Sequence, residues 1–552
     1  MRAPSLVALT LVAGCAVEPV VEPGEGSAEQ PGSSALVLVG TVVTMDETRP
    51  AEERVLGGGQ VVVQGGKIVA VLPAGAPLPA EVAGARRVET GGLIFPGLIN
   101  THNHLAYNFL PPWEMPRVHD EPFANMYDWM EGSGDFAEAF ASYDTNVVQP
   151  KNAAMAAGLP SAIGRWSELK ELVGATTTTQ GSRSFRRAEQ GAEDNASFAT
   201  TLVRNMDLER GARLRQSSIG IFLPRPTNAP PGTPHELNTD MLAGVVRAVE
   251  QHKVDAFMVH LAEGTDAATR HELHDLNDFE RAADQECGPL APVSVIIHGT
   301  PFGSDEFALM ARCGMKLAAS PLDNLLYYGT APDLAVATAM GVPVAIGTDW
   351  SPAGSKNLLV ELATVDFLNQ ALWGGALDDD AIVRMVTANA ADMIGWGNRA
   401  GRIRVGLQAD LAVIRGELAG PADEVYRALI EAREQDVQLV MVGGQPLWGD
   451  PALLEGLYGQ AGGFDVVPSG CGFDKAVMLL SGAPDGQQHY VDLESTLREG
   501  LAAAAPGSPL SPLFQCADPG YFAAIERNGN VTFTHPEAAG LVEHLRDSFL
   551  PP

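Results

Sequence analysis

The sequence predicts a (β/α)8 barrel inserted into a small β-sandwich domain that both ends of the chain build. The barrel prediction rests on apolar, strand-like segments that alternate with helical patterns about every 20–40 residues over roughly 300 residues. The sandwich prediction rests on short alternating segments bounded by Gly and Pro, which occur before residue 97 and again after residue 400. A doubly wound α/β fold is the rival, but no GxGxxG motif opens any of the predicted helices.

The predicted elements follow one another in a regular order. The first half of the β-domain is "ALVLVGTVVTM", "GQVVVQGGKIVAVL" and "RRVET", and the second half is "GRIRVGLQADLAVIR" and "VQLVMVGGQPLWG". Between them, "RWSELKELVGA" predicts a helix that ends at Gly174. Predicted barrel strands are "ATTTTQG", "SIGIFLPRP" (the fourth), "DAFMVHL", "VSVIIHG", "KLAAS" and "PVAIGTD". A helix is expected over "DAATRHELHDLNDFERAADQEC", and another over "SDEFALMARCG" with Ser304 as its N-cap.

These patterns divide the chain into six expected parts. They are a signal peptide (1–14), a disordered tether (15–34), the first part of the sandwich (35–97), the barrel (98–399), the second part of the sandwich (400–450) and a C-terminal extension of unknown role (451–552).

The N-terminus has the pattern of a bacterial export signal. "MRAPSLVALTLVAGC" carries one positive charge, at Arg2, and an apolar run that is too short to span a bilayer. "VAGC" resembles a lipobox, which implies cleavage before Cys15 and lipid attachment to its thiol; a plain secretory signal is the alternative. We therefore expect an exported protein, lipid-anchored to the cell envelope at the outer membrane and facing the periplasm or the surface. Its membrane contact would be through the anchor alone.

The net charge of the chain limits the kinds of partner that it can bind. With 36 Lys and Arg against 68 Asp and Glu, the formal net charge is −32, and no basic stripe exists to neutralise phosphates. This excludes nucleic acid and leaves a small-molecule substrate, with a homodimer as an open option.

Export places the other four cysteines in an oxidising compartment. Three pairings are available, of which we expect the shorter loops, Cys287–Cys313 and Cys471–Cys516.

Polar residues occur at the ends of four predicted strands, where barrels of this kind carry their chemistry. His102 and His104 lie in "FPGLINTHNHLAYN", and the others are His260 in "MVHLAEG", His298 in "IIHGT" and Asp349 in "IGTDWSP". Residues i and i+2 of a strand point the same way, so His102 and His104 can converge on one ion. An HxH arises by chance in roughly one such chain in four, but its recurrence with other ligand types at strand ends predicts a divalent metal site.

A family resemblance supports the same site. "PGLINTHNH", "HLAEG", "HGT", "SPLDNL", "GTDWSP", "TANAADMIG" and "GLQADLAVI", spread over about residues 36–447, together resemble the metal-dependent amidohydrolase superfamily. They are most similar to its branch of cytosine and guanine deaminases, triazine hydrolases and imidazolonepropionase-like enzymes. The resemblance implies a metal held by four residues, with Zn2+ expected and Fe2+ as the alternative: His102, His104, His260 and Asp349. It also assigns Glu263, His298 and Asp349 to proton handling around a metal-activated water.

One metal ion is expected rather than two. Binuclear members of the superfamily bridge their ions with a carboxylated lysine, usually on the fourth strand. No lysine occurs here between Lys170 and Lys253, and a glutamate three residues after His260 is typical of the mononuclear branch. A bridging carboxylate from elsewhere would reverse this expectation, and Glu209 is the nearest candidate.

Two loops contain the candidate residues for contact with the substrate. In "SPLDNLLYYG", Asp323 stands where the family usually carries a serine, which suggests a cationic or amine-bearing ligand; Asn324 follows it. The alternative is that Asp323 only caps a turn. The segment after His104 offers Tyr107, Asn108, Trp113 and Trp129, for which packing is the alternative role; the first three are our candidate substrate contacts.

The expected function is hydrolysis of a carbon–nitrogen bond other than a peptide bond, by deamination or cyclic amide hydrolysis of a small, cyclic or amino-bearing substrate. A binuclear esterase, lactonase or dipeptidase on the same fold is one alternative, which the missing lysine disfavours. A non-catalytic, lipid-anchored binding protein is the other, which the intact set of ligand and proton-handling residues disfavours.

Overall fold

The computed structural model describes residues 35–550, apart from 117–120, 133, 182–201, 208–213, 218–219, 224–234, 419, 422–423, 459–462, 480–488 and 534. The predicted signal peptide, tether and lipidation site at Cys15 therefore lie outside the described residues, as does Glu209. Among the helices that the structure does describe, none combines the length and apolar character needed to span a bilayer.

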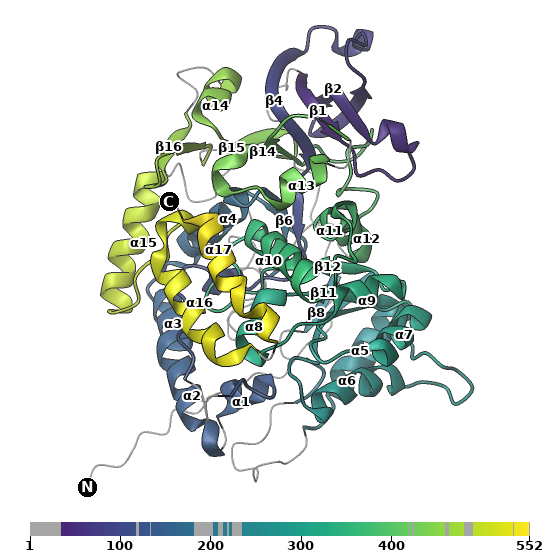
Figure 1. Cartoon of the computed structure of the whole chain (residues 1–552), viewed down its shortest axis with the longest axis vertical. Coiled ribbons are helices and arrows are strands. Elements are labelled where there is room, and N and C mark those ends of the chain that lie inside the picture. Colours follow the sequence, from purple (N-terminus) through teal and green to yellow (C-terminus); the bar gives the residue numbers. More distant parts are fainter. Residues whose placement is uncertain are drawn as a thin grey trace.

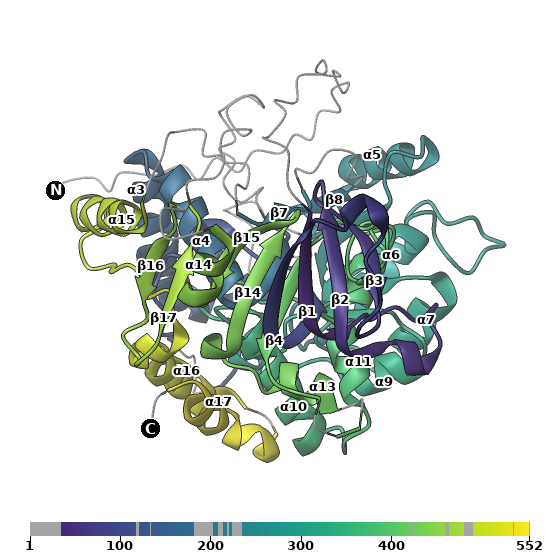
Figure 2. The ribbon, with the colours of Figure 1, turned by 90° about the horizontal axis from the view of Figure 1, so that it is seen from above.

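Both ends of the chain build one nine-stranded sheet. Its strands from the first hundred residues are β1 (Leu36–Val43), β2 (Val55–Gln64), β3 (Lys67–Leu72) and β4 (Arg86–Pro96). Those from the second half are β13 (Leu411–Arg415), β14 (Val437–Val442), β15 (Gln445–Gly449), β16 (Asp465–Pro468) and β17 (Asp474–Val477). The order is β16-β17-β15-β14-β13-β4-β1-β2-β3, so the antiparallel pair β4–β13 joins the two halves. Figure 2 shows strands of the first half beside those of the second. The sheet thus extends past residue 450, through β16 and β17.

Eight further strands follow in sequence order. β5 (Leu98–Asn100), β6 (Thr176–Thr179) and β7 (Arg204–Asn205) form one parallel sheet. A second comprises β8 (Leu214–Ser217), β9 (Ala256–Leu261), β10 (Ser294–His298), β11 (Lys316–Ala319) and β12 (Val344–Ile346). The last strand lies beside the first, because Asn103 and Asp349 form a parallel bridge and Thr101 Oγ1 donates to the Ile346 carbonyl at 3.0 Å. The carboxyl ends of β5, β9, β10 and β12 are thereby brought together.

Alternate strand residues pack into two separate clusters, as the period of a strand requires. One cluster includes Phe257, Val259, Ile296 and Leu317, together with buried residues of the helices. The other holds the intervening residues Ile99, Met258, Val295, Ile297 and Ala345, and residues of α12 (Ala388–Met393) complete it. Both faces of these strands are therefore apolar, and polar groups are left to the strand ends.

Helices connect and cover these strands (Figure 1). They include α4 (Pro160–Val173), α5 (Thr239–Glu250), α6 (Ala267–Asp278), α7 (Ser304–Cys313), α8 (Pro321–Tyr328), α9 (Leu334–Ala339), α10 (Leu358–Ala371), α11 (Asp379–Arg384) and α13 (Glu424–Ile430). Before them, α1 (Met126–Glu131), α2 (Ala137–Tyr143) and α3 (Gln149–Ala156) follow the loop after β5. The predicted end of α4 at Gly174 is confirmed.

Three local predictions were wrong. The N-cap of α7 is Gly303 rather than Ser304, because the Glu306 carboxylate accepts the Gly303 N–H at 2.8 Å. The fourth strand, β8, ends at Ser217, before the segment we expected, and Gly220 beyond it has a left-handed φ of +74°. The helix expected to reach Cys287 stops at Asp278, and Glu280 beyond it has a φ of +52°.

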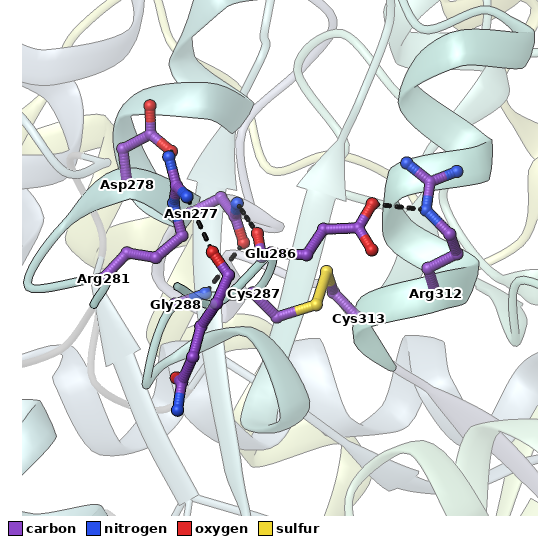
Figure 3. Close-up of a disulfide and its surroundings, with 9 residues drawn as sticks. Asn277, Asp278, Arg281, Glu286, Cys287, Gly288, Arg312 and Cys313 are labelled. Carbon is purple, nitrogen blue, oxygen red and sulfur yellow. Dashed lines mark hydrogen bonds and ion pairs between the residues drawn. A yellow bond between two sulfur atoms is a disulfide. The ribbon is translucent and has the colours of Figure 1, made fainter. Parts of the chain in front are cut away.

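Two disulfides connect the expected cysteine pairs, Cys287–Cys313 and Cys471–Cys516. The first ties the loop after α6 to the end of α7, and Figure 3 shows the polar contacts around it. Asn277 Nδ2 donates to the Glu286 carbonyl at 2.9 Å, and Asn277 Oδ1 accepts the Gly288 N–H at 3.1 Å. The loop is therefore fixed at both its backbone and its cysteine.

The C-terminal extension packs on the loops that follow β5 and β12. Its helices are α14 (Pro451–Tyr458), α15 (Tyr490–Ala504), α16 (Pro519–Thr532) and α17 (Leu541–Phe549), and α16 and α17 pack against α8 and α10 (Figure 1). Asn528 donates to the Trp113 carbonyl at 3.0 Å and accepts the Met115 N–H at 3.1 Å. Tyr521 Oη donates to the Gly354 carbonyl at 2.8 Å. These buried contacts hold two loops that border the strand ends.

Candidate metal and catalytic site

The four expected metal ligands converge at the carboxyl ends of the strands. His102 and His104 follow β5, His260 lies near the end of β9, and Asp349 follows β12. Asp349 Oδ1 lies 3.2 Å from His102 Nε2 and 3.3 Å from His104 Nε2, and the two Nε2 atoms of His104 and His260 are 3.3 Å apart. Residues separated by up to 247 positions in sequence (349 − 102) thus direct their ligand atoms toward one point.

This donor set fits a tetrahedrally bound divalent ion. Ligand bonds of about 2.0–2.1 Å place the ligand atoms of a tetrahedron about 3.3 Å apart. The three separations above agree with that spacing. In addition, His102 Nε2 is fully buried and makes no hydrogen bond with the residues that the structure describes, which is costly unless the atom serves as a ligand. Three imidazole nitrogens and a carboxylate oxygen are ligands that Zn2+ prefers.

Gln180, directly after β6, sets the tautomer of His102. Its Oε1 accepts the Asn103 N–H at 3.1 Å and lies 3.4 Å from His102 Nδ1. Because an amide oxygen only accepts, the ring proton belongs on Nδ1, which leaves a lone pair on Nε2. Burial lowers the pKa of His102 to about 3, so the ring is neutral and able to bind a metal.

His298, at the end of β10, has the opposite tautomer. Asn324 directs its Nδ2 to His298 Nδ1 at 3.0 Å, so Nδ1 accepts and the ring proton lies on Nε2. That Nε2 is 3.4 Å from Glu263 Oε2 and 3.9 Å from Asp349 Oδ2. In this tautomer His298 Nε2 is a hydrogen-bond donor, although His298 also offers a nitrogen within 4.8 Å of ligand atoms of His102 and His260. Its φ of +75°, like the +59° of Asp349, is a strained backbone state that is typical of functional positions.

Glu263, three residues after His260, is a buried carboxyl group with a hydroxyl partner. Tyr328 Oη donates to Glu263 Oε1 at 2.6 Å and itself accepts the Trp129 indole N–H at 3.1 Å. Burial, followed by the neighbouring carboxylates Asp349 and Asp323, raises the pKa of Glu263 well above its usual value. A carboxyl group in this environment can hold a proton near neutral pH and donate it to a substrate.

The candidate substrate residues divide into two groups. Asp323 and Tyr107 border the site: Asp323 Oδ1 accepts the Trp350 indole N–H at 3.1 Å, and the Tyr107 ring lies 5.3 Å from that of Trp350. Asn324 instead holds His298, as described above. Asn108 has both ends of its amide engaged within the protein, since Nδ2 donates to Asn103 Oδ1 at 2.8 Å and Oδ1 accepts the Ser351 N–H at 3.0 Å.

Trp113 has a packing role in this structure. Its indole N–H donates to Ser142 Oγ at 3.0 Å, and its ring lies 6.2 Å from Trp129 and 6.0 Å from Tyr327. The side chain is buried within an aromatic cluster that also includes Tyr143. Trp113 therefore packs against Trp129 and Tyr327.

Sequence reasoning missed three contributors to the site. Gln180 ends the strand "ATTTTQG" as the histidines end theirs, which is a signal that could have identified it. Tyr328 lies on α8 with Asp323, but nothing in the sequence directs it to Glu263. Glu171 of α4 accepts from the side chains of Asn100 and Asn103, on either side of His102, and has no recognisable signal.

Comparison with known families gives the first assignment. Residues 227–447 match the model of the amidohydrolase family. This segment is an amidohydrolase family domain. It contains His260, Glu263, His298, Asp323 and Asp349, while His102 and His104 precede it.

Curated relatives extend the similarity over most of the chain. A 5-methylthioadenosine/S-adenosylhomocysteine deaminase of Syntrophobacter fumaroxidans is 25% identical over 450 residues, which cover 76% of this chain and 94% of the relative. An 8-oxoguanine deaminase of Pseudomonas aeruginosa is 25% identical over 409 residues, 70% of this chain and 88% of the relative. These homologues support metal-dependent amidohydrolase or deaminase activity, on carbon–nitrogen bonds other than peptide bonds.

Solved structures share the amidohydrolase fold. A variant of atrazine chlorohydrolase from Arthrobacter aurescens TC1, in complex with zinc and atraton, has a TM-score of 0.53 at 19% identity, covering 75% of this chain and 95% of that one. A guanine deaminase from C. acetobutylicum with bound guanine has a TM-score of 0.50 at 14% identity, covering 75% and 99%. At this identity the likeness is one of fold alone.

Proposed function

We propose that this protein is a zinc-dependent deaminase or cyclic amidase that hydrolyses a carbon–nitrogen bond in a small, cyclic or amino-bearing substrate. The observation that carries the proposal is the convergence of three imidazole Nε2 atoms and Asp349 Oδ1 at tetrahedral spacing. Fe2+ is the alternative ion. The deaminase names of the relatives support amino-heterocycles, purines included, as the first substrates to test.

We also propose that β5 to β12 close into a (β/α)8 barrel. The bridge between Asn103 and Asp349, which brings the last strand beside the first, supports closure. In such a barrel the site occupies the end at which these folds carry their chemistry.

The chemistry divides among the named side chains. Bound to His102, His104, His260 and Asp349, the ion would lower the pKa of a bound water molecule to about 7. Asp349 would provide Oδ1 as a ligand, and its Oδ2 would accept the proton that the water loses. His298 Nε2–H donates to the oxygen on which negative charge develops. Glu263 then gives its proton to the substrate nitrogen as the carbon–nitrogen bond breaks. Return of the proton from Asp349 to Glu263 completes the balance, so that the water supplies OH to carbon and H to nitrogen. Deamination releases ammonia, whereas hydrolysis of a cyclic amide leaves the amine on the opened product.

The metal content per chain tests this proposal directly. Protein without a histidine tag is purified and its metals are measured by mass spectrometry, beside His102→Ala and a control, His271→Ala, whose side chain is 67% exposed on α6. We expect close to one equivalent of zinc in the wild type and the control, and loss of zinc in His102→Ala. Protein that binds no divalent ion would overturn the proposal, and two equivalents would require a bridging ligand.

Catalysis is tested separately by ammonia release from amino-heterocycles and ring opening of cyclic amides. Glu263→Gln keeps the size of the side chain but removes the proton donor. We therefore expect this variant to retain zinc and to lose activity by roughly 100-fold or more. Full activity in Glu263→Gln would show that the assigned proton donor is wrong.

We further propose that the protein is an exported lipoprotein anchored through Cys15. The lipobox-like "VAGC" supports this, as do two disulfides, which persist in oxidising compartments. A Cys15→Ser variant is expected to move from the membrane fraction to the soluble fraction and to lose labelling by a clickable fatty acid. Unchanged fractionation and labelling would refute the anchor.

A further inference from the structure

The amide of Asn108 joins the two loops that carry metal ligands. Its Nδ2 donates to Asn103 Oδ1 at 2.8 Å, and its Oδ1 accepts the Ser351 N–H at 3.0 Å. Asn103 stands between the two histidine ligands of the loop after β5, and Ser351 comes two residues after the ligand Asp349. Asn108 is only 1% exposed, so water does not compete for these two bonds.

Backbone hydrogen bonds also join the two loops, at the ligands themselves. The Asp349 N–H donates to the His102 carbonyl at 3.0 Å, and the His104 N–H donates to the Asp349 carbonyl at 2.7 Å. These bonds fix the register of the two segments. Metal ligands must also be held within about 0.5 Å and 10–20° of their productive geometry, which requires support beyond the ligands. Asn108 provides that support on both loops.

A buried lysine in turn holds the backbone of Asn108. Lys170 of α4 is fully buried, and its Nζ donates to the Asn108 carbonyl and, at 3.1 Å, to Ser511 Oγ. Lysine is rarely buried, because removing its amino group from water is costly unless its N–H groups are paired. The two acceptors therefore identify what Lys170 connects, which is the loop after β5 and the C-terminal extension.

Ser511 is the residue of the extension that meets this loop. Its N–H donates to the Phe109 carbonyl at 2.9 Å, and its carbonyl accepts the Trp166 indole N–H at 3.2 Å. Phe109 directly follows Asn108, so two successive backbone carbonyls of the loop are held at this point, one by Ser511 and one by Lys170. The extension thus contributes an acceptor to Lys170 and a donor to the loop.

We propose that the C-terminal extension is a functional part of the metal site: Ser511 orients Lys170, Lys170 holds Asn108, and Asn108 sets the spacing of the two ligand-carrying loops. All three are positioning residues, since none of them is one of the four ligands. The inference rests on the proposed function, because it concerns the ion at those ligands. It gives a role to residues 451–552, which lie beyond the match to the amidohydrolase family model at 227–447.

Zinc affinity tests this inference without any substrate. It is measured by competition with a chromophoric chelator, beside the free energy of unfolding in urea. Asn108→Leu keeps the volume of the side chain and removes both amide bonds, Lys170→Met keeps most of the apolar stem and removes the amine, and Ser511→Ala removes one hydroxyl.

The expected losses decrease along the chain of contacts. Loss of a residue that orients a ligand typically weakens metal binding 10- to 100-fold, and these three residues act through others. We therefore expect zinc affinity to fall about 10-fold in Asn108→Leu, about 5-fold in Lys170→Met and about 3-fold in Ser511→Ala.

Two matched controls separate positioning from a general loss of stability. Asn369 is also buried, and its amide binds both the carbonyl and the N–H of Leu377, near the far end of α10. Lys475 of β17 is buried and donates to backbone carbonyls, that of Val437 at 2.8 Å among them. Asn369→Leu and Lys475→Met should lose stability and keep the zinc affinity of the wild type.

A double variant tests the link to the extension. If Ser511 acts through Lys170, the Lys170→Met/Ser511→Ala protein should bind zinc no more weakly than Lys170→Met alone. Should Lys170→Met fail to fold, Asn108→Leu takes its place in the same comparison. Additive losses would overturn the assigned order of contacts, and so would wild-type affinity in Ser511→Ala. Equal losses in the two controls would show that the effect is one of stability alone.

Failure of this inference is distinct from failure of the proposed function. Wild-type protein that binds one equivalent of zinc, with the same affinity in all three site variants, would refute the role of the extension and leave the metal site intact. Wild-type protein that binds no zinc would refute the proposed function itself.

Discussion

Replacing Gln180 with methionine should weaken metal binding without touching a ligand. Gln180 Oε1 is the acceptor that keeps the proton of His102 on Nδ1, and it also accepts the Asn103 N–H. Methionine has nearly the same length but no amide. Without the acceptor, the His102 ring is free to rotate or to place its proton on Nε2, where it would block the metal.

The structure sets the size of the effect. Loss of an orienting partner of a ligand typically costs 10- to 100-fold in metal affinity. The distance of 3.4 Å between His102 Nδ1 and Gln180 Oε1 is long for a hydrogen bond, so we expect the lower end of that range, about 10-fold or ~1.4 kcal/mol. The unpaired Asn103 N–H should separately lower the free energy of unfolding by about 1–3 kcal/mol.

Zinc affinity is measured by competition with a chromophoric chelator, which needs no substrate. Gln60→Met is the matched control, because Gln60 is also buried and donates to the carbonyls of Pro73 and Ala76, far from the site on β2. Both variants should lose stability, but only Gln180→Met should lose zinc affinity. Equal zinc affinity in Gln180→Met and the wild type would refute the role of Gln180, and so would an equal loss in the control.

Three other perturbations have defined outcomes. Tyr328→Phe removes the hydroxyl that donates to Glu263. We expect kcat/KM, measured on a substrate identified by ammonia release, to fall by roughly 10- to 150-fold. This range corresponds to the free energy of one hydrogen bond to an ionisable group. Burial raises the pKa of Glu361 from 4.5 to about 8, so the folded state binds more protons than the unfolded state between those values. Stability should therefore fall as pH rises from about 5 to 8, and Glu361→Gln should make this slope shallower by up to about 1.4 kcal/mol per pH unit in urea unfolding. Removing the Cys287–Cys313 disulfide, which spans 26 residues, should lower the free energy of unfolding by about 3.5 kcal/mol in the same assay.

Each of these has a control. Tyr458→Phe deletes a hydroxyl that donates to the Pro446 carbonyl at 2.7 Å on the far sheet, and its activity should match the wild type. If Tyr458→Phe loses as much activity as Tyr328→Phe, the loss in Tyr328→Phe comes from reduced stability of the fold rather than from the contact with Glu263. If the free energy of unfolding of Glu361→Gln has the same pH dependence as that of the wild type, Glu361 is not the cause of that dependence. Reductant cleaves both Cys287–Cys313 and Cys471–Cys516, so reduced wild-type protein should lose at least as much stability as the variant without Cys287–Cys313. Unchanged stability after full reduction would contradict the assigned role of the bond.

Several features followed from residue patterns because their causes are local. Strand-end histidines are recognisable because each follows an apolar run. His298 is the last residue of β10, His260 is the penultimate residue of β9, and His102 comes two residues after β5. The two cysteine pairs follow from short loop lengths, and the contribution of both chain ends to one sheet follows from matching strand patterns. The errors were also local: the Gly303 cap, and the early ends of α6 and β8, depend on backbone angles that periodicity does not record.

By itself, the sequence determined which residue types stand at the strand ends, and hence that a metal ligand set with a proton donor was available. Only the tertiary structure decided what each group does. The tautomers of His102 and His298 depend on Gln180 and Asn324. Burial and two distant aspartates raise the pKa of Glu263, and the hydrogen bond from Tyr328 lowers it. These contacts join residues tens to hundreds of positions apart, and their energies come from burial and hydrogen bonding, which exist only once the strands have assembled.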